Sequence, residues 1–237
     1  MIFLTEHWFE AASSIQQRFG PITVRPDGIK DERKARQYIA QVVGILRALE
    51  AATKIGKAVI TSVRFHNRPV LIFPYDGQGG ECNAWAKKDW GLFTGTVSFT
   101  PFVHGGASSC AGPRGTYEPA GAPHELLLHE LTHIVRAVSG KIGDSDEEEI
   151  AVMVANMFSA EIHRDLISDY NIRNTIAANS DLAAFSRDYY EENEDMVEAF
   201  CRQSKQFALR LALVDTVFNP PRQYFEKTRP PEWPRRR

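Results

Sequence analysis

The 237 residues are enough for one large domain or two small ones, and a hydrophobic share of 43 % permits a sizeable core. The formal net charge of -2 excludes a global electrostatic field that would recruit nucleic acid or a membrane surface. No apolar run reaches the length that crossing a bilayer requires. We therefore expect a globular protein with no membrane span and no nucleic-acid partner.

The N-terminal segment and the cysteines bear on the cellular compartment. Met1–His7 shows no basic stretch followed by a long apolar run, so we expect no cleaved secretory leader. Cys82 and Cys110 lie in glycine-rich sequence and are interpreted either as a pair in an oxidising compartment or as free thiols. Cys201 falls in a helical pattern and is predicted to be a small buried hydrophobe. Because no cysteines form a C-x-x-C pair, a thiolate zinc site is not expected.

The first hundred residues predict a mixture of helix and strand. Turn residues mark the stretch 1–30, and apolar residues at three- and four-residue steps predict an amphipathic helix over 31–52. Residues 57–65 are ambiguous between a short helix and a strand. The apolar run 69–74, which lies between prolines, predicts a strand.

Two glycine-rich segments flank a second predicted strand. Residues 75–91 are expected to form a loop, whereas 92–103, rich in β-branched and aromatic residues, predicts a strand or a hairpin arm. Residues 105–121 predict a long loop, of a kind that is usually functional or disordered in compact domains. Since this loop leads directly into the next helix, we expect it to border a cleft.

The helix that follows is predicted to be central and buried. Its apolar residues cover nearly every side of the segment Leu126–Val138, which is typical of a buried helix. Pro123 suits its first turn because the N–H that proline lacks would have no hydrogen-bond partner there. Glu125 suits the same turn because a negative charge is favourable at the positive end of the helix dipole. Gly140 follows its end as a stop signal.

The rest of the chain is expected to be helix-rich. An acidic start introduces a helix over 145–165, residues 166–192 are helical in pieces, and 194–216 predicts a further helix. We interpret the whole as one α+β domain with a small β-sheet in its N-terminal half. Its parts are an N-terminal lobe at 1–120, a helical lobe at 121–222 and an extended basic tail at 223–237.

A possible metal motif lies within the central helix. His129 and His133 are four residues apart, so on a helix they share one face and both imidazoles can reach a single metal ion. Glu130 follows the first histidine, which completes the H-E-x-x-H pattern of zinc peptidases, where the glutamate is the general base. The structural alternative is that both histidines are hydrogen-bonded core residues, since unpaired buried polar groups are costly.

Catalytic zinc needs a third protein ligand, which we expect from the acidic start of the next helix. Glu148 is favoured because it shares a helical face with small residues that would allow close approach of the two helices. Glu147 is the competing candidate, whereas Glu149 faces a more polar side. Capping offers another interpretation, because Ser145 with Glu148, or Asp144 with Glu147, forms a capping box. If Asp144 is the N-cap, Glu147 caps the helix and Glu148 is free to bind metal.

This constellation predicts hydrolysis of peptide bonds. Glu130 would take a proton from zinc-bound water and deliver it to the leaving amine, with one zinc ion per chain. A further donor usually stabilises the oxyanion that forms at the attacked carbonyl. His163 and Tyr170 are the candidates for that donor, although an ordinary surface or packing role is the alternative for each.

The motif 129–133, followed by the segment 147–152 and Asn156, resembles the zinc metallopeptidase toxin domains of bacterial secretion effectors. The most similar are those fused to type VI secretion spike proteins and to Rhs proteins, over roughly residues 35–222. The resemblance implies a zincin-like, gluzincin-like fold with two histidines and one glutamate on zinc, and its glutamate maps to Glu148. Glu149 departs from the usual aromatic residue of this family, and Tyr170 stands where a histidine is expected.

The resemblance also implies where such a protein acts. It suggests a toxin that is cytoplasmic in the producing cell and is delivered without a leader into the periplasm or host cytoplasm of a target cell. A protein or peptide would be its substrate and a cognate immunity protein its partner. The alternative is a non-enzymatic helical interaction domain with a structural or absent metal site. In that reading, Arg235–Arg237 would help to dock a partner, while nucleic-acid binding is disfavoured by the overall charge.

Overall fold

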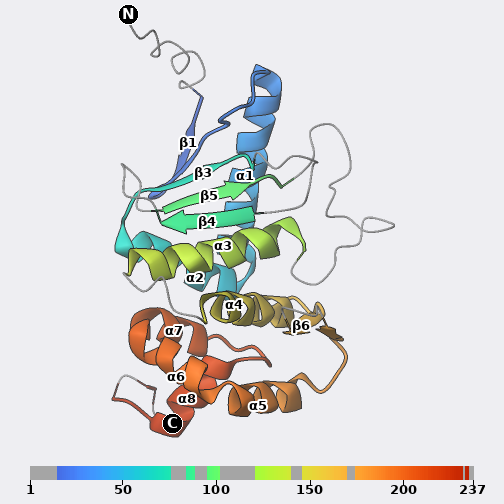
Figure 1. The fold of residues 1–237 in the computed structure, drawn as a ribbon, viewed down its shortest axis with the longest axis vertical. Helices are drawn as coiled ribbons and strands as arrows, with labels where there is room; N and C mark the ends of the chain where they lie inside the picture. Colours follow the sequence, from blue (N-terminus) through green and yellow to red (C-terminus); the bar gives the residue numbers. More distant parts are fainter. Residues whose placement is uncertain are drawn as a thin grey trace, which may run out of the picture.

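The computed structural model describes residues 15–75, 84–88, 95–101, 121–139, 146–169, 174–231 and 233–234. A mixed sheet occupies one end of the molecule, the helices of the C-terminal half occupy the other, and α3 and α4 lie between them (Figure 1). This mixture of helices with a small sheet confirms the predicted α+β class.

Within the described residues, five strands form the main sheet. In spatial order they are β1 (Gln17–Phe19), β2 (Ile22–Val24), β3 (Val70–Phe73), β5 (Gly95–Phe99) and β4 (Ala84–Lys88). The three central strands are parallel, and an antiparallel strand closes each edge. The sheet therefore ends on β4, which lies against α3 in Figure 1.

The structure confirms the strands predicted around residues 69–74 and 92–103, but it corrects the prediction of a loop over 75–91. Residues 84–88 of that segment form β4. Their side chains alternate between half-buried and exposed, with Trp85 and Lys87 pointing to solvent. This edge strand has one face open to solvent and is ordered by its pairing with β5 rather than by an apolar run. Its amino-acid composition therefore does not predict a strand.

Two consecutive helices connect β2 to β3. α1 (Glu32–Ala52) begins where the Asp31 side chain accepts the Lys34 N–H, close to the predicted start. α2 (Lys54–His66) resolves the ambiguous segment 57–65 as helix. Its side chains repeat with a helical rather than a two-residue period, since one face is buried and the other carries charged groups.

The central helices α3 (Pro123–Val138) and α4 (Glu147–Glu161) pack against each other. α3 starts with its proline in the first turn and reaches its C-cap at Ser139, as the sequence predicts. It lies so close to β5 that a Cβ on Gly95 would come within 2.6 Å of Ile134 Cδ1. α3 is therefore held between the sheet and α4, with most of its surface buried.

The C-terminal part begins with a small hairpin of β6 (Leu166–Asp169) and β7 (Asn174–Ile176). Four helices follow it: α5 (Leu182–Glu192), α6 (Glu194–Gln203), α7 (Lys205–Ala212) and α8 (Pro220–Thr228).

Three predictions for this part need correction. Residues 166–169 and 174–176, which belong to the segment predicted to be helical in pieces, form the strands β6 and β7. The single helix predicted over 194–216 is divided into α6 and α7 at Ser204. The tail predicted to be extended from residue 223 is helical up to Thr228. Two prolines suggested extended chain, but both stand in the first turn of α8, where the Asn219 side chain caps the helix by accepting the Arg222 N–H.

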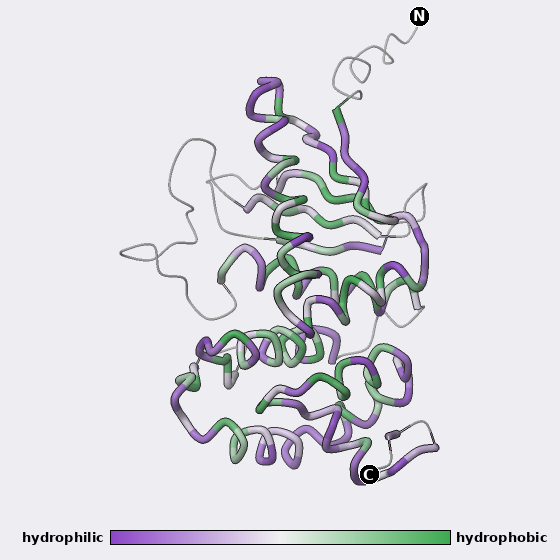
Figure 2. Tube along the Cα trace, turned by 180° about the vertical axis from the view of Figure 1, so that it is seen from behind, coloured by the Kyte–Doolittle hydropathy of each residue, from purple (hydrophilic) through white to green (hydrophobic). Residues whose placement is uncertain are grey.

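One hydrophobic cluster connects the sheet with the helices of both halves. Figure 2 shows that hydrophobic residues concentrate along the strands and the neighbouring helices, whereas the outer end of α1 is hydrophilic. Cys201 belongs to this cluster as predicted and is buried. Among the described helices, none has the length and hydropathy that a transmembrane segment needs.

Candidate metal centre

α3 presents His129 and His133 one turn apart, toward the first turn of α4. Their rings meet edge to face with centroids 4.8 Å apart, and the two Nε2 atoms are separated by 3.1 Å. His133 is buried and His129 is largely buried. Two ring nitrogens at this distance can share one N–H···N hydrogen bond, or both can direct lone pairs at a cation between them.

Glu148 of α4 completes the group. Its Oε2 lies 3.3 Å from His129 Nε2, and its Oε1 lies 3.5 Å from His133 Nε2. The close approach of the two helices follows from the buried small residues Ala151 and Ala155 along the same side of α4. The three ligands predicted from sequence therefore converge at one point, with their ligand atoms within 4.8 Å of one another.

The separations of these atoms suit a zinc ion. Ligand atoms that lie about 2.0–2.1 Å from zinc in a tetrahedral arrangement are about 3.3–3.4 Å apart from each other. The two Nε2 atoms, 3.1 Å apart, are close to that value, and Glu148 reaches each of them with a different oxygen, Oε2 at 3.3 Å from His129 and Oε1 at 3.5 Å from His133. Two imidazoles and one carboxylate also form a donor set that zinc accepts, and three protein ligands leave a fourth position open.

The electrostatics of the group couple a carboxylate to a protonated histidine. Burial lowers the pKa of His133, but its hydrogen bonds to Glu147 and Glu148 outweigh burial and raise that pKa to about 9, so a cation would have to displace a proton from His133. Hydrogen bonds to His129 and His133 hold the pKa of the Glu148 carboxyl far below its usual range, so it is ionised at neutral pH. The Glu148 side chain is half-exposed, while the histidines beside it are more buried. The group is thus open on the side of Glu148 and closed behind the histidines.

Glu147 has a different role from the two that the sequence offered. The N-cap of α4 is Asp146, while Asp144 and Ser145 of the two predicted capping boxes lie outside the described residues. Glu147 instead turns toward α3, where its Oε1 lies 3.1 Å from His133 Nδ1 and its Oε2 accepts Arg136 Nε at 2.6 Å. The spacing of His133 and Arg136, three residues apart on one helical face, is the sequence signal that could have indicated a shared partner.

Glu130 lies beside the three converging side chains in a buried environment, with 7 % of its surface exposed. Burial raises the pKa of the Glu130 carboxyl above its ordinary value, although the neighbouring histidines oppose the shift. The backbone N–H of Ala86 in β4 donates to this carboxylate. A carboxyl with a raised pKa next to a candidate metal position has the properties of a general base that takes up and returns a proton.

The structure does not bring His163 to this group. It follows the C-terminal end of α4, whereas Glu148 lies in the first turn, so the length of the helix, about 20 Å, separates them. His163 is exposed and adopts a left-handed backbone conformation, which suits the turn after a helix. Tyr170, the loop predicted over 105–120, Cys82 and Cys110 lie outside the described residues.

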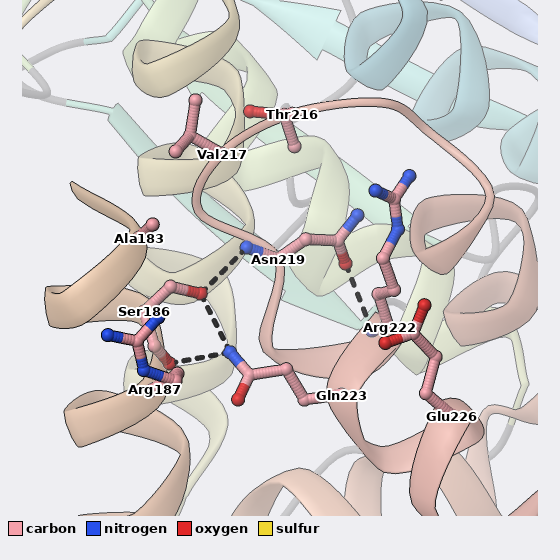
Figure 3. A pocket seen from close by; sticks show the side chains of 9 residues that line it. All are labelled: Ala183, Ser186, Arg187, Thr216, Val217, Asn219, Arg222, Gln223 and Glu226. Carbon is pink, nitrogen blue, oxygen red and sulfur yellow. Dashed lines mark hydrogen bonds between the residues drawn. The ribbon is translucent and has the colours of Figure 1, made fainter.

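A separate pocket of about 360 Å³ lies between α5 and α8, away from the histidines (Figure 3). The polar groups around it hold the helices together. Ser186 Oγ accepts from the Asn219 backbone N–H and from Gln223 Nε2, and Arg222 donates to the carbonyls of Ala212 and Val214. Because the polar groups around the pocket are used in these hydrogen bonds, we interpret the pocket as part of a structural junction between helices.

No family model, curated protein or solved structure matches the chain. The geometry of the group therefore carries the functional argument. It combines three converging metal-ligand side chains with a buried carboxyl beside them, an arrangement that can hold a cation and move a proton.

Proposed function

We propose that this protein is a zinc-dependent metalloendopeptidase with a zincin-like fold. The observation that carries the proposal is the convergence of His129, His133 and Glu148, with the buried Glu130 next to them. These three side chains would hold one zinc ion, and Glu130 would act as the general base. The distances between the ligand atoms and the perturbed pKa values of Glu130 and Glu148 support this assignment.

A bound zinc ion would act as a Lewis acid toward a peptide carbonyl and make a water more acidic. Glu130 would accept a proton from the attacking water and would return it to the leaving amine. The raised pKa of Glu130 favours the transfer of this proton to the amine, because a carboxyl with a higher pKa can keep the proton near neutral pH until the amine leaves. Burial also keeps bulk water away from this carboxyl.

The position of β4 supports a peptide as the substrate. β4 is the edge strand of the sheet, and the Ala86 N–H points out of the sheet toward Glu130. In an antiparallel strand the N–H and C=O of one residue point the same way, so the Ala86 carbonyl shares that side. An extended peptide laid along this edge would have its backbone close to the general base.

The biological role that we propose is that of a secreted bacterial effector with toxin activity. It rests on the resemblance of segments 129–133 and 147–152 to the peptidase domains of type VI and Rhs effectors. Cleavage of a protein in the periplasm or cytoplasm of a target cell, and neutralisation by an immunity protein in the producer, follow from that role.

The test begins with metal content. We expect about one zinc ion per purified chain by elemental analysis, and no zinc in His129→Ala. Glu130→Gln should keep the zinc and lose about 100- to 10,000-fold of its activity toward an unfolded protein such as casein, since a general base contributes about that much. Glu149→Gln, which removes a neighbouring exposed charge, is the control and should retain both.

The competing function is a helical interaction domain without catalysis. In that case chelator treatment would leave the melting temperature unchanged, whereas loss of a bound zinc should lower it. Zinc binding together with full activity of Glu130→Gln would refute the general-base assignment. A protein that never contains zinc would refute the peptidase proposal altogether.

A further inference from the structure

We infer that Glu147 is a positioning residue of the metal centre, which selects the tautomer of His133, and that Arg136 holds Glu147 in that orientation. The inference rests on the proposed function, because it assumes that His133 is a metal ligand. It adds two residues that do not themselves touch the metal. The carboxylate of Glu147 bridges both side chains of α3, with one oxygen on each.

The first step concerns the hydrogen on His133. A carboxylate can only accept, so the 3.1 Å contact between Glu147 Oε1 and His133 Nδ1 places a hydrogen on Nδ1. Metal binding requires the neutral imidazole, whose other nitrogen then carries a lone pair. That nitrogen, Nε2, is the atom that faces His129 and Glu148. Glu147 thus favours the tautomer that a metal ligand needs.

The second step concerns what fixes Glu147. Its Oε2 accepts from Arg136 Nε at 2.6 Å, and the Arg136 side chain is completely buried. The Arg136 guanidinium lies over the Phe200 ring of α6, with 5.7 Å between its central carbon and the ring centroid. Arg136 is therefore immobilised by packing as well as by charge, and it can only donate.

These contacts also separate the roles of the two adjacent glutamates. Both oxygens of Glu147 are engaged on the Nδ1 side of His133, whereas the metal position lies on the Nε2 side. Glu148, the next residue, reaches the Nε2 atoms. Anchoring Glu147 to α3 also fixes the first turn of α4, from which Glu148 extends.

Glu147→Gln tests the inference because it nearly preserves shape while changing hydrogen bonding. Arg136 is an obligate donor, so the amide oxygen of the new side chain will face Arg136 and its NH₂ group will face His133 Nδ1. That arrangement favours the opposite tautomer, with hydrogen on Nε2. We expect zinc affinity, measured by competition with a chelating dye, to fall about 10- to 100-fold. Glu149→Gln is the matched control and should bind zinc as the wild type does.

A double variant supplies the rescue. In Arg136→Met with Glu147→Gln, the amide oxygen is released from Arg136 and can accept the His133 Nδ1 hydrogen. The double variant should then regain a large part of the zinc affinity that Glu147→Gln loses. The visible absorption of the Co²⁺-loaded protein should likewise return toward that of the wild type. A purely structural role of Glu147 would not produce recovery when a second buried side chain is altered.

The outcomes separate this inference from the proposed function. Absence of zinc from the wild type would overturn both. Zinc in the wild type, with equal affinity in Glu147→Gln and Glu149→Gln, would overturn the positioning role alone. If zinc-free Glu147→Gln melts well below zinc-free Glu149→Gln, a general loss of stability would also explain its weaker zinc binding. The double variant then separates the two explanations, because a neutral buried pair is often tolerated. A double variant that melts as the wild type does but keeps the weakened affinity would also overturn it.

Discussion

The two ends of the α3–α4 pair use the same chemistry for different purposes. At one end Glu147 of α4 pairs with the buried Arg136 of α3, and at the other Glu125 of α3 pairs with Arg164, just beyond α4. In both cases one carboxylate oxygen contacts an arginine. The difference lies in what else the carboxylate binds.

At the far end the remaining contacts of Glu125 close the start of a helix. One oxygen accepts the Ala122 backbone N–H and the other accepts the Ser159 hydroxyl, so Glu125 ties the first turn of α3 to α4. At the near end the second oxygen of Glu147 contacts His133 instead. A glutamate–arginine pair with one fully buried partner therefore joins two helices at one end and belongs to the proposed metal centre at the other.

The largest effect on stability is expected from Arg136→Met. It leaves the Glu147 carboxylate without its buried cation, and breaking a buried pair by removing one partner costs about 3–5 kcal/mol. Urea unfolding of the zinc-free protein would measure this loss. Because Glu147 still accepts from His133, zinc affinity should fall less than in Glu147→Gln. A loss of stability below about 1 kcal/mol would show that the near end does not depend on the pair.

The sequence predicts most side chains of the candidate metal site but not the residues that support them. His129, Glu130 and His133 follow from spacing on one helix, and Glu148 follows from a short connection and a face of small residues. The contact of Glu147 with α3 depends instead on how two antiparallel helices align, which neither segment specifies alone. The local sequence predicts a helix cap for Glu147, whereas the structure shows its tertiary contacts with His133 and Arg136.

The fold shows the same division between local and long-range causes. Long periodic segments such as α1 and α3 are predictable, because each carries its own apolar face and end signals. Strand β4 is not, since its order comes from pairing with β5 while its own side chains are half exposed. α8 departs from the prediction of an extended tail from residue 223, because Pro220 and Pro221 occupy its first turn, where proline is compatible with a helix.

A smaller effect is expected from Glu125→Gln at the far end. An amide presents an oxygen on one side only, so the variant cannot accept both from the Ala122 N–H and from Ser159 with Arg164. Leaving a buried donor unsatisfied costs about 1–3 kcal/mol. Zinc affinity should equal that of the wild type. A marked loss of affinity would show that the two ends are not independent.

The cost of Glu125→Gln should also depend on pH. Burial raises the pKa of the Glu125 carboxyl above its unfolded value, although Arg164 opposes this. The folded protein then holds the proton to a higher pH than the unfolded chain, so this group's contribution to stability falls as pH rises through that interval. The difference in unfolding free energy between wild type and variant should therefore be larger at about pH 4 than at about pH 7.

The smallest effect is expected from Glu161→Gln, at the C-terminal end of α4. The Glu161 carboxylate accepts the backbone N–H groups of Lys54 and Ile55, with one oxygen on each, at the N-terminus of α2. Glutamine keeps one acceptor and loses the charge that favours a helix N-terminus, which should cost about 0.5–2 kcal/mol in unfolding experiments.

The length of α4, about 20 Å, separates Glu161 from the proposed metal ligand Glu148. We therefore expect Glu161→Gln to lower the melting temperature slightly, relative to Glu149→Gln, and to leave zinc affinity unchanged. Weaker zinc binding in this variant would mean that a change at the C-terminal end of α4 displaces Glu148 at its N-terminal end. The near-end contacts of Glu147 would then be insufficient to place Glu148, and the contrast between the two ends would fail.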